Sequence, residues 1–193
     1  MERTRHQNRI SAIRMRPLAV LIAHICSLGA LGLTLMANSE LSEAAPQGGQ
    51  VVGGAATIQQ NGTRTQILQQ SPRAMIDWRS FSVGATESVN FSQPGATAAI
   101  LNRVVGSDPS AILGRITANG QVFLVNPNGI VFGRESQVNV GSLLATTSNI
   151  ANADFMAGRL EFRQPGKPGA SVINEGRITI AEGGFAGLVA PTV

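Results

Sequence analysis

The sequence predicts an all-β chain that coils as a parallel β-helix, a single-stranded solenoid. Short runs rich in Val, Ile, Phe and Thr alternate with Gly, Asn, Asp, Ser or Pro, which is the pattern of strands joined by turns. Few two-residue Asn-Gly or Asp-Gly connections join runs of matched length, so hairpins are not favoured. The tetrapeptide Gly-Arg-Ile-Thr also occurs twice, starting at Gly114 and at Gly176. An ordinary β-sandwich with many short strands is the alternative.

The strand pattern begins after a glycine-rich segment, residues 47–54, which we expect to be a flexible start. The clearest strands are five short runs bounded by turn residues. They are Glu87–Phe91, Gly114–Ala118, Gln121–Val125, Gly129–Gly133 and Gln137–Gly141. The segment Leu143–Asp154 has some apolar spacing, but its Thr, Ser and Asn residues weaken a helix. We expect a loop or a short helical turn there.

The repeated Gly-Arg-Ile-Thr motif suggests the length of one circuit, which is one complete turn of the β-helix. The second copy follows the first by 62 positions, close to three circuits of about 20 residues. Side chains alternate along a strand, so we expect Arg115 and Thr117 to face outward. The expected inward residues are Ile116, Ala118, Val122, Leu124, Ile130 and Phe132.

The aromatic residues are expected to pack in the core. Phe81, Phe91, Phe123 and Phe132 all lie in β-prone runs, which favours core packing over a ligand cage. Burial of Trp78 under the first coil is favoured over an exposed role in partner binding. The final residues, 183–193, stop in mid-pattern without a polar cap, so we expect a chain truncated at its C-terminus, with further coils beyond it.

Residues 1–44 have the order of a long, cleaved secretory signal peptide. Five arginines precede an apolar stretch, Leu18–Ala37, which is followed by small residues. We expect cleavage after Ala44, because a cut after Ala45 would place Pro46 directly beyond the bond. A retained membrane helix is the alternative. Lipidation of Cys26 is not expected, because Ile25 precedes it where a small residue is needed.

The remaining chain, residues 45–193, has a composition that excludes several function classes. It carries ten basic and eight acidic residues, spread singly, which does not favour nucleic-acid binding. Both histidines and the single cysteine lie in the leader, so Ser-His-Asp, Cys-His and His-ligated zinc sites are unavailable. We therefore expect no metal and no cofactor.

The carboxylates give little support to an enzyme. No two lie close enough in sequence to form an obvious acid–base or metal pair. The alternative is a β-helical polysaccharide-degrading enzyme, in which distant carboxylates and arginines converge in one groove. That hypothesis requires Asp77, Glu87, Asp108 and Asp154 to lie together. We expect a protein that is not an enzyme.

The segment Asn126-Pro127-Asn128-Gly129 has the residues of a type I β-turn between two strands. The Asn126 side chain is expected to bond its own backbone two residues on. Pro127 restricts φ, and Gly129 eases the exit from the turn. A structural role alone accounts for these four residues.

Longer blocks of sequence resemble a known family. These blocks are SPRAMIDWRSFSVGATESVNF, LNRVVGSDPSAILGRITANGQVFLVNPNGIVFG, VNVGSLLATT and NADF, in that order. Together they resemble the amino-terminal two-partner secretion (TPS) domain, or haemagglutination-activity domain, of filamentous haemagglutinin-like exoproteins. The resemblance runs from about residue 51 to residue 193, and we assign residues 45–193 to this domain.

The resemblance implies a right-handed parallel β-helix that targets a large adhesin or haemagglutinin-like exoprotein for secretion. It implies export by the Sec route and then through a TpsB-like outer-membrane β-barrel transporter of the Omp85 type, whose POTRA domains recognise this domain. The product would be extracellular or on the surface of a Gram-negative bacterium. Downstream regions would contact a host or neighbouring cell, and a contact-dependent toxin is an alternative to an adhesin.

The family motif Asn-Pro-Asn-Gly-Ile falls on Asn126, Pro127, Asn128, Gly129 and Ile130, which the resemblance implies as the secretion motif recognised by the partner. A second motif of some members, Asn-Pro-Asn-Leu, is absent from this sequence.

Overall fold

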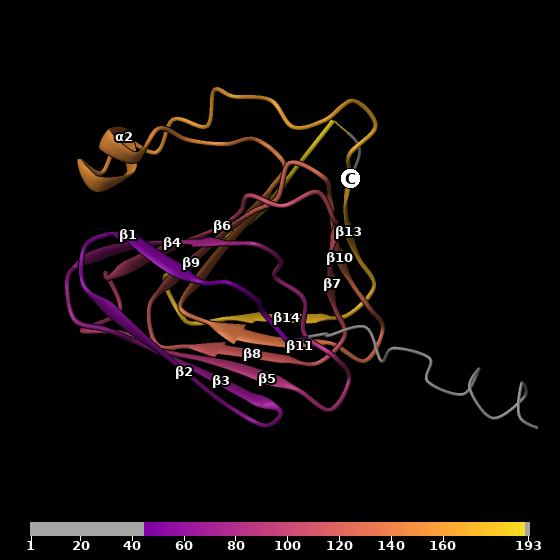
Figure 1. Cartoon of the computed structure of the whole chain (residues 1–193), viewed down its shortest axis with the longest axis horizontal. Helices are drawn as coiled ribbons and strands as arrows, with labels where there is room; N and C mark the ends of the chain where they lie inside the picture. The colour runs from indigo at the N-terminus through magenta and orange to yellow at the C-terminus, as the bar shows by residue number, and fades with distance from the viewer. Residues whose placement is uncertain (1–44, 192–193) are drawn as a thin grey trace, which may run out of the picture. The chain divides into compact units, whose positions relative to one another are not determined.

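The computed structural model describes residues 45–191, whose strands form three sheets around a shared core (Figure 1). The first sheet has the order β1 (Gln50–Gly53), β4 (Arg73–Trp78), β6 (Ala99–Val104), β9 (Gln121–Val125), β12 (Ser142–Thr146) and β15 (Ala186–Val189). The second has the order β2 (Ala56–Asn61), β3 (Arg64–Gln69), β5 (Ser88–Ser92), β8 (Arg115–Ala118), β11 (Gln137–Val140) and β14 (Arg177–Ile180). The third contains β7 (Ser110–Ile112), β10 (Ile130–Phe132) and β13 (Val172–Asn174).

The chain winds through these sheets in a fixed order. From β6 onward it visits the first, third and second sheets in turn and repeats that order as far as β15. Each strand pairs in parallel with the strand one circuit earlier: Ala99 lies beside Gln121, and Gln121 lies beside Ser142. The all-β prediction with parallel strands is confirmed.

The repeated Gly-Arg-Ile-Thr motif does not span the three circuits that its spacing predicts. Arg115 pairs with Gln137, and Gln137 pairs with Arg177, so the two copies are two circuits apart rather than three. The second circuit is longer because residues 147–171 leave the coil before β13 begins. An insertion of this kind changes the sequence period without changing the stacking.

The start of the chain is more ordered than expected. Residues 47–54 were expected to be flexible, but β1 lies within them and pairs antiparallel with β4. In addition, β2 and β3 form an antiparallel hairpin, in which Gly62 has a positive φ of 55°. Ala56 and Ile58 of β2 pack against the core. This segment therefore covers the N-terminal end of the coil and shields the apolar side chains there from water.

The core inside the coil contains the residues that alternation along the strands predicts. Ile116, Val122, Leu124, Ile130 and Phe132 are buried there, and Ala118 packs against them half-buried. Arg115 is exposed and Thr117 is half-buried on the opposite face. Trp78 is buried, as expected, and its ring meets that of Phe81 edge-to-face with the ring centroids 5.5 Å apart.

A second apolar cluster lies outside the coil, over the first sheet. Phe123 belongs to this outer cluster, so it is buried as expected but faces away from the coil interior. The helix α2 (Asn152–Met156) and its flanking segment cover this face (Figure 1). The outer cluster contains Met75, Ala99, Leu101, Phe123, Val125, Ile150 and Phe155, with Leu144 and Phe162 against it.

The segment Leu143–Asp154 ends in the expected short helical turn, but its first residues form a strand rather than a loop. Residues 143–146 belong to β12, and α2 begins at Asn152. Thr146, one of the polar residues that weaken a helix, ends this strand, where Thr is favoured. Within residues 45–191, no helix has the length and apolar character needed to cross a membrane. The leader and the expected cut after Ala44 lie outside the described residues.

Candidate functional site: the Asn-Pro-Asn-Gly turn

The Asn-Pro-Asn-Gly segment forms the turn between β9 and β10, as its composition predicts. The Gly129 N–H donates to the Asn126 carbonyl oxygen at 3.1 Å, which closes the turn. The Asn128 N–H donates to the Asn126 side-chain oxygen Oδ1 at 2.9 Å, the expected bond two residues on. Gly129 has a φ of 116°, a conformation that favours glycine.

Asn126 joins three successive circuits of the chain. Its side chain is fully buried, and its Nδ2 donates to the Asp108 carbonyl oxygen at 3.0 Å and to the Ser110 hydroxyl at 2.9 Å. Both acceptors lie one circuit earlier. The Asn126 N–H donates to the carbonyl oxygen of Thr146, one circuit later, at 3.0 Å. Asparagine supplies donors and an acceptor on a short side chain, so a buried residue at this position satisfies several backbone groups at once.

Asn128 strengthens the link to the earlier circuit. Its Nδ2 donates to the Gly106 carbonyl oxygen at 2.9 Å and to Asn126 Oδ1 at 2.8 Å. The Asn128 side-chain oxygen is buried without a hydrogen-bond partner within residues 45–191. The residue as a whole is half-buried, so part of it reaches the surface.

The other motif residues hold the turn to the following circuit. The Pro127 carbonyl oxygen accepts the Lys167 N–H at 2.8 Å, and the Ile130 N–H donates to the Ser171 carbonyl oxygen at 2.9 Å. Ile130 is fully buried in the core. The fold therefore brings all five motif residues together, but only Pro127 and Asn128 retain partial exposure.

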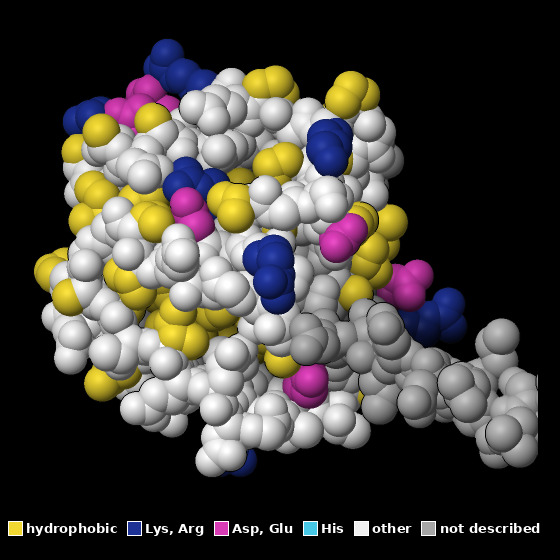
Figure 2. All heavy atoms as spheres, viewed as in Figure 1, with side chains coloured by type: hydrophobic (Ala, Val, Ile, Leu, Met, Phe, Trp, Pro, Cys, Tyr) yellow, Lys and Arg dark blue, Asp and Glu magenta, His cyan; other side chains and the backbone are white. Residues whose placement is uncertain are grey.

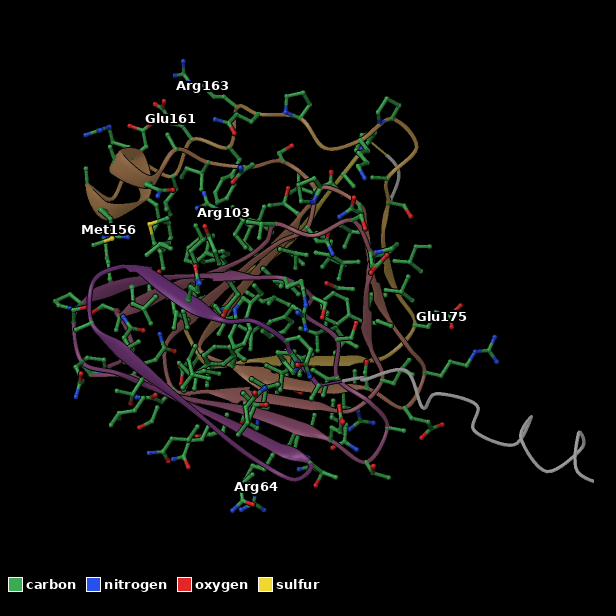
Figure 3. All side chains as sticks on the ribbon, in the orientation of Figure 1. Arg64, Arg103, Met156, Glu161, Arg163 and Glu175 are labelled. Atoms are coloured by element: carbon green, nitrogen blue, oxygen red, sulfur yellow. The ribbon has the colours of Figure 1, made fainter. Side chains whose placement is uncertain are left out.

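Those two residues line a shallow hollow of about 480 Å³. Charged side chains also line it, and their position beside the turn was not predicted from the sequence. On its wall, Arg103 binds Asp77 through two bonds, Nε to Oδ1 at 2.8 Å and Nη2 to Oδ2 at 3.0 Å. Arg103 points toward the segment with α2 (Figure 3), where its Nη1 donates to Asn152 Oδ1 at 2.8 Å. Asp77 and Arg103 meet because β4 and β6 pair at these positions, which only the register of the sheet reveals.

Three of the four carboxylates required by the polysaccharide-degrading alternative, those of Asp77, Glu87 and Asp154, do not converge. Asp77 pairs with Arg103, the Glu87 side chain accepts the Gly84 N–H at 2.7 Å, and Asp154 pairs with Arg159 at 2.7 Å. Each of these contacts lies in a different hollow or on a different element. No cluster of three metal-ligating residues occurs within residues 45–191. Basic side chains stand singly on the face shown in Figure 2.

Comparison with known proteins gives the family. A family model described as the TPS secretion domain matches residues 42–193. The chain belongs to the TPS secretion domain family. Exoproteins of this family are secreted across the outer membrane of Gram-negative bacteria with the help of an outer-membrane transporter. The predicted resemblance to filamentous haemagglutinin-like proteins is confirmed at the level of the family.

Individual relatives of this TPS domain come from Haemophilus influenzae. A heme/hemopexin-binding protein of strain ATCC 51907 / DSM 11121 / KW20 / Rd is 43% identical over 105 residues, which are 54% of this chain and 12% of the relative. A second protein of that name is 38% identical over 132 residues, or 68% of this chain and 14% of the relative. The matched part thus spans a small share of these relatives.

The crystal structure of the HMW1 secretion domain from Haemophilus influenzae is also similar. It has a TM-score of 0.71 and 36% sequence identity, with 75% of this chain and 39% of that chain covered. This similarity supports the arrangement of parallel strands described above.

Proposed function

We propose that this TPS domain is the secretion-targeting module of a large surface-exposed or released adhesin or haemagglutinin-like exoprotein. It enters the periplasm by the Sec route, and the POTRA domains of an Omp85-type, TpsB-like transporter then recognise it. The motif Asn126–Ile130 takes part in this recognition. Folding into a right-handed parallel β-helix follows outside the cell and provides the template for later coils.

Burial of the motif is the observation that carries this proposal. Asn126 and Ile130 are both fully buried, and the Asn126 amide donates to the Asp108 carbonyl oxygen and to the Ser110 hydroxyl. A partner has no access to these two residues in the folded coil. Recognition therefore acts before the coil closes around the turn, when the β-prone segments are still free to pair with a partner by strand addition.

The topology supports both the handedness and the template role. Parallel strands joined by crossover connections are right-handed in nearly all known cases. In a coil, each strand contacts mainly the circuits before and after it, so folding propagates from a formed circuit to the next. The antiparallel segment β1 to β3 covers the N-terminal end of the coil, so new circuits can be added only at the C-terminal end.

Regions beyond the matched segment would supply the effector activity. The matched part covers only 12% and 14% of the two Haemophilus relatives. We assign contact with a host or neighbouring cell, or a contact-dependent toxin, to such regions.

The test separates recognition from folding with two variants of similar stability. Asn126→Ala leaves buried backbone and hydroxyl groups unpaired, and Ile116→Ala leaves a cavity in the neighbouring core, each at a cost of about 3 kcal/mol. Export is measured in cells that contain the cognate transporter, and the free energy of unfolding is measured by urea titration of the purified chain. We expect Asn126→Ala to be exported less than Ile116→Ala at equal stability.

Equal export of the two variants at equal stability would contradict the proposed recognition of the motif. In that case Asn126 would serve only the fold. Export of both variants without the transporter gene would contradict the secretion-targeting function as a whole.

A further inference from the structure

The outer face of the second sheet carries two straight rows of polar side chains that the secretion function does not use. In the first, the arginine row, the parallel register aligns one residue from each strand. Its members are Arg64, Ser88, Arg115, Gln137 and Arg177. In the second, the amide row, the same register aligns Gln66, Asn90, Thr117, Asn139 and Thr179.

The arginines recur on every second strand. Neighbouring strands lie about 4.8 Å apart, so Arg64, Arg115 and Arg177 follow one another at intervals of about 9.5 Å. All three side chains are exposed, and Arg64 projects away from the sheet in Figure 3. The ion pairs within residues 45–191 involve Arg103, Arg134, Arg159 and Arg163, and none of them uses an arginine of this row.

Acidic groups lie near the arginine row, but they reduce its positive charge only around Arg115. A hollow of about 240 Å³ beside Arg115 is lined by Glu87 and Glu135. The Glu87 carboxylate is held by the Gly84 N–H at 2.7 Å, and Glu175 at the same corner pairs with Arg134 at 3.4 Å. Glu135 is exposed and is the acidic group best placed to oppose an anion at Arg115.

The amide row offers hydrogen bonds in a fixed arrangement. The Asn90 Nδ2 donates to the Thr117 hydroxyl at 2.8 Å, which orders both side chains. A hollow of about 370 Å³ runs past Asn90, Thr117 and Asn139. No exposed aromatic side chain stands in either row, so this face has no platform for stacking on a sugar or a base. Recognition here relies on hydrogen bonds and charge.

We propose that this face binds a linear polysaccharide that carries a carboxylate on alternate sugars. Guanidinium groups bind carboxylates through two parallel hydrogen bonds. The arginine interval of two strands corresponds to two sugar rings of an extended chain, so successive carboxylates meet successive arginines. Amide and hydroxyl side chains of the second row bind the sugar hydroxyl groups.

Binding of this kind is weak at each contact and gains strength from repetition. An exposed ion pair contributes little, because water and salt screen it. When several arginines bind carboxylates of the same polymer, the affinity of the whole chain exceeds that of any single pair. The Asn-Pro-Asn-Gly turn lies between the first and third sheets, so this face is separate from the proposed secretion motif.

The test measures binding of the full chain to immobilised hyaluronan, in which uronate alternates with a neutral amino sugar. Replacement of all three row arginines, Arg64→Gln, Arg115→Gln and Arg177→Gln, is expected to weaken binding about tenfold. The matched control, Arg159→Gln, Arg163→Gln and Lys167→Gln, removes the same charge from the segment around α2 and is expected to change binding less than about twofold. The variant Glu135→Gln is expected to strengthen binding.

Three outcomes would overturn the proposal. In the first, the row variant binds hyaluronan as the unchanged chain does while thermal unfolding shows both folded. In the second, the control variant loses as much binding as the row variant, which indicates a general effect of charge. In the third, neutral dextran or duplex DNA binds as tightly as hyaluronan at the same salt concentration, so carboxylate spacing has no role.

Discussion

Asn126 holds the turn to two neighbouring circuits through contacts on both sides of the strand. Its side chain reaches Asp108 and Ser110 on one side, and its backbone N–H reaches Thr146 on the other. Asn128 reaches the earlier circuit through Gly106 and also binds Asn126 Oδ1. The two asparagines therefore form one hydrogen-bonded unit.

The first prediction concerns the coupling between these asparagines. Because Asn128 Nδ2 donates to Asn126 Oδ1, the losses in Asn126→Ala and Asn128→Ala are not independent. We expect a coupling energy of about 1 kcal/mol in a double-mutant cycle, measured by urea unfolding. As a control, Asn126→Ala combined with Asn139→Ala, which is exposed, should be additive. An additive result for the asparagine pair would show that their contact contributes nothing to stability.

The second prediction concerns Gly129. A Cβ atom at this position would lie 3.1 Å from the Ser171 carbonyl oxygen, and φ is 116°. We expect Gly129→Ala to lower the free energy of unfolding by about 2 kcal/mol. Gly95→Ala is the control, because φ there is not positive and an added Cβ meets no atom within 4 Å. A Gly129→Ala variant as stable as the control would mean that the turn relaxes without cost.

At the scale of elements, α2 and the segment around it form a cover over the first sheet. The Phe123 ring meets that of Phe155 edge-to-face at 5.4 Å and stacks on that of Phe162 at 6.3 Å. Arg103 adds the bond to Asn152 and fixes the start of the helix, which has no side-chain cap of its own. This cover shields apolar side chains that would otherwise face water.

The third prediction concerns this attachment. Arg103→Ala leaves Asp77 and Asn152 without their shared partner, at a cost of about 2 kcal/mol because the pair is mostly shielded from solvent. Amide hydrogen exchange in residues 149–164 should become faster, while exchange in β8 and β11 changes less. Arg159→Ala removes an exposed pair with Asp154 and should leave exchange in this segment unchanged. Equal exchange rates in both variants would show that Arg103 does not hold the cover.

The sequence predicts elements better than their connections. Alternation identified the inward side chains, such as Ile116 and Leu124, because the period of a strand is a local property. The same alternation places Phe123 on the outer face, between the inward Val122 and Leu124, but it did not predict the second cluster around Phe155 that buries Phe123 there. The pair of Asp77 and Arg103 was also missed, because these residues meet only through the register of β4 and β6. Local patterns carry no information on such register.

At the scale of the whole molecule, folding buries the residues that the family motif contains. Each circuit pairs with its neighbours, so the turn at Asn126 closes only when the circuits before and after it are in place. We propose that secretion and folding are thereby ordered in time. In this proposal the transporter acts on a chain that is still open, and the closed coil prevents the chain from sliding back.

The most direct test of this order is export of a chain whose circuits are linked covalently. Asn90 and Thr117 are neighbours in parallel strands, whose Cα atoms lie about 4.8 Å apart, within the range for a disulfide. Cysteines at these two positions have no competitor after residue 26. We predict that Asn90→Cys/Thr117→Cys chains remain in the periplasm under oxidising conditions. They should be exported normally with a reductant, as should each single variant. Export of the disulfide-linked chain at the rate of the unchanged chain would contradict the claim that recognition and passage precede folding.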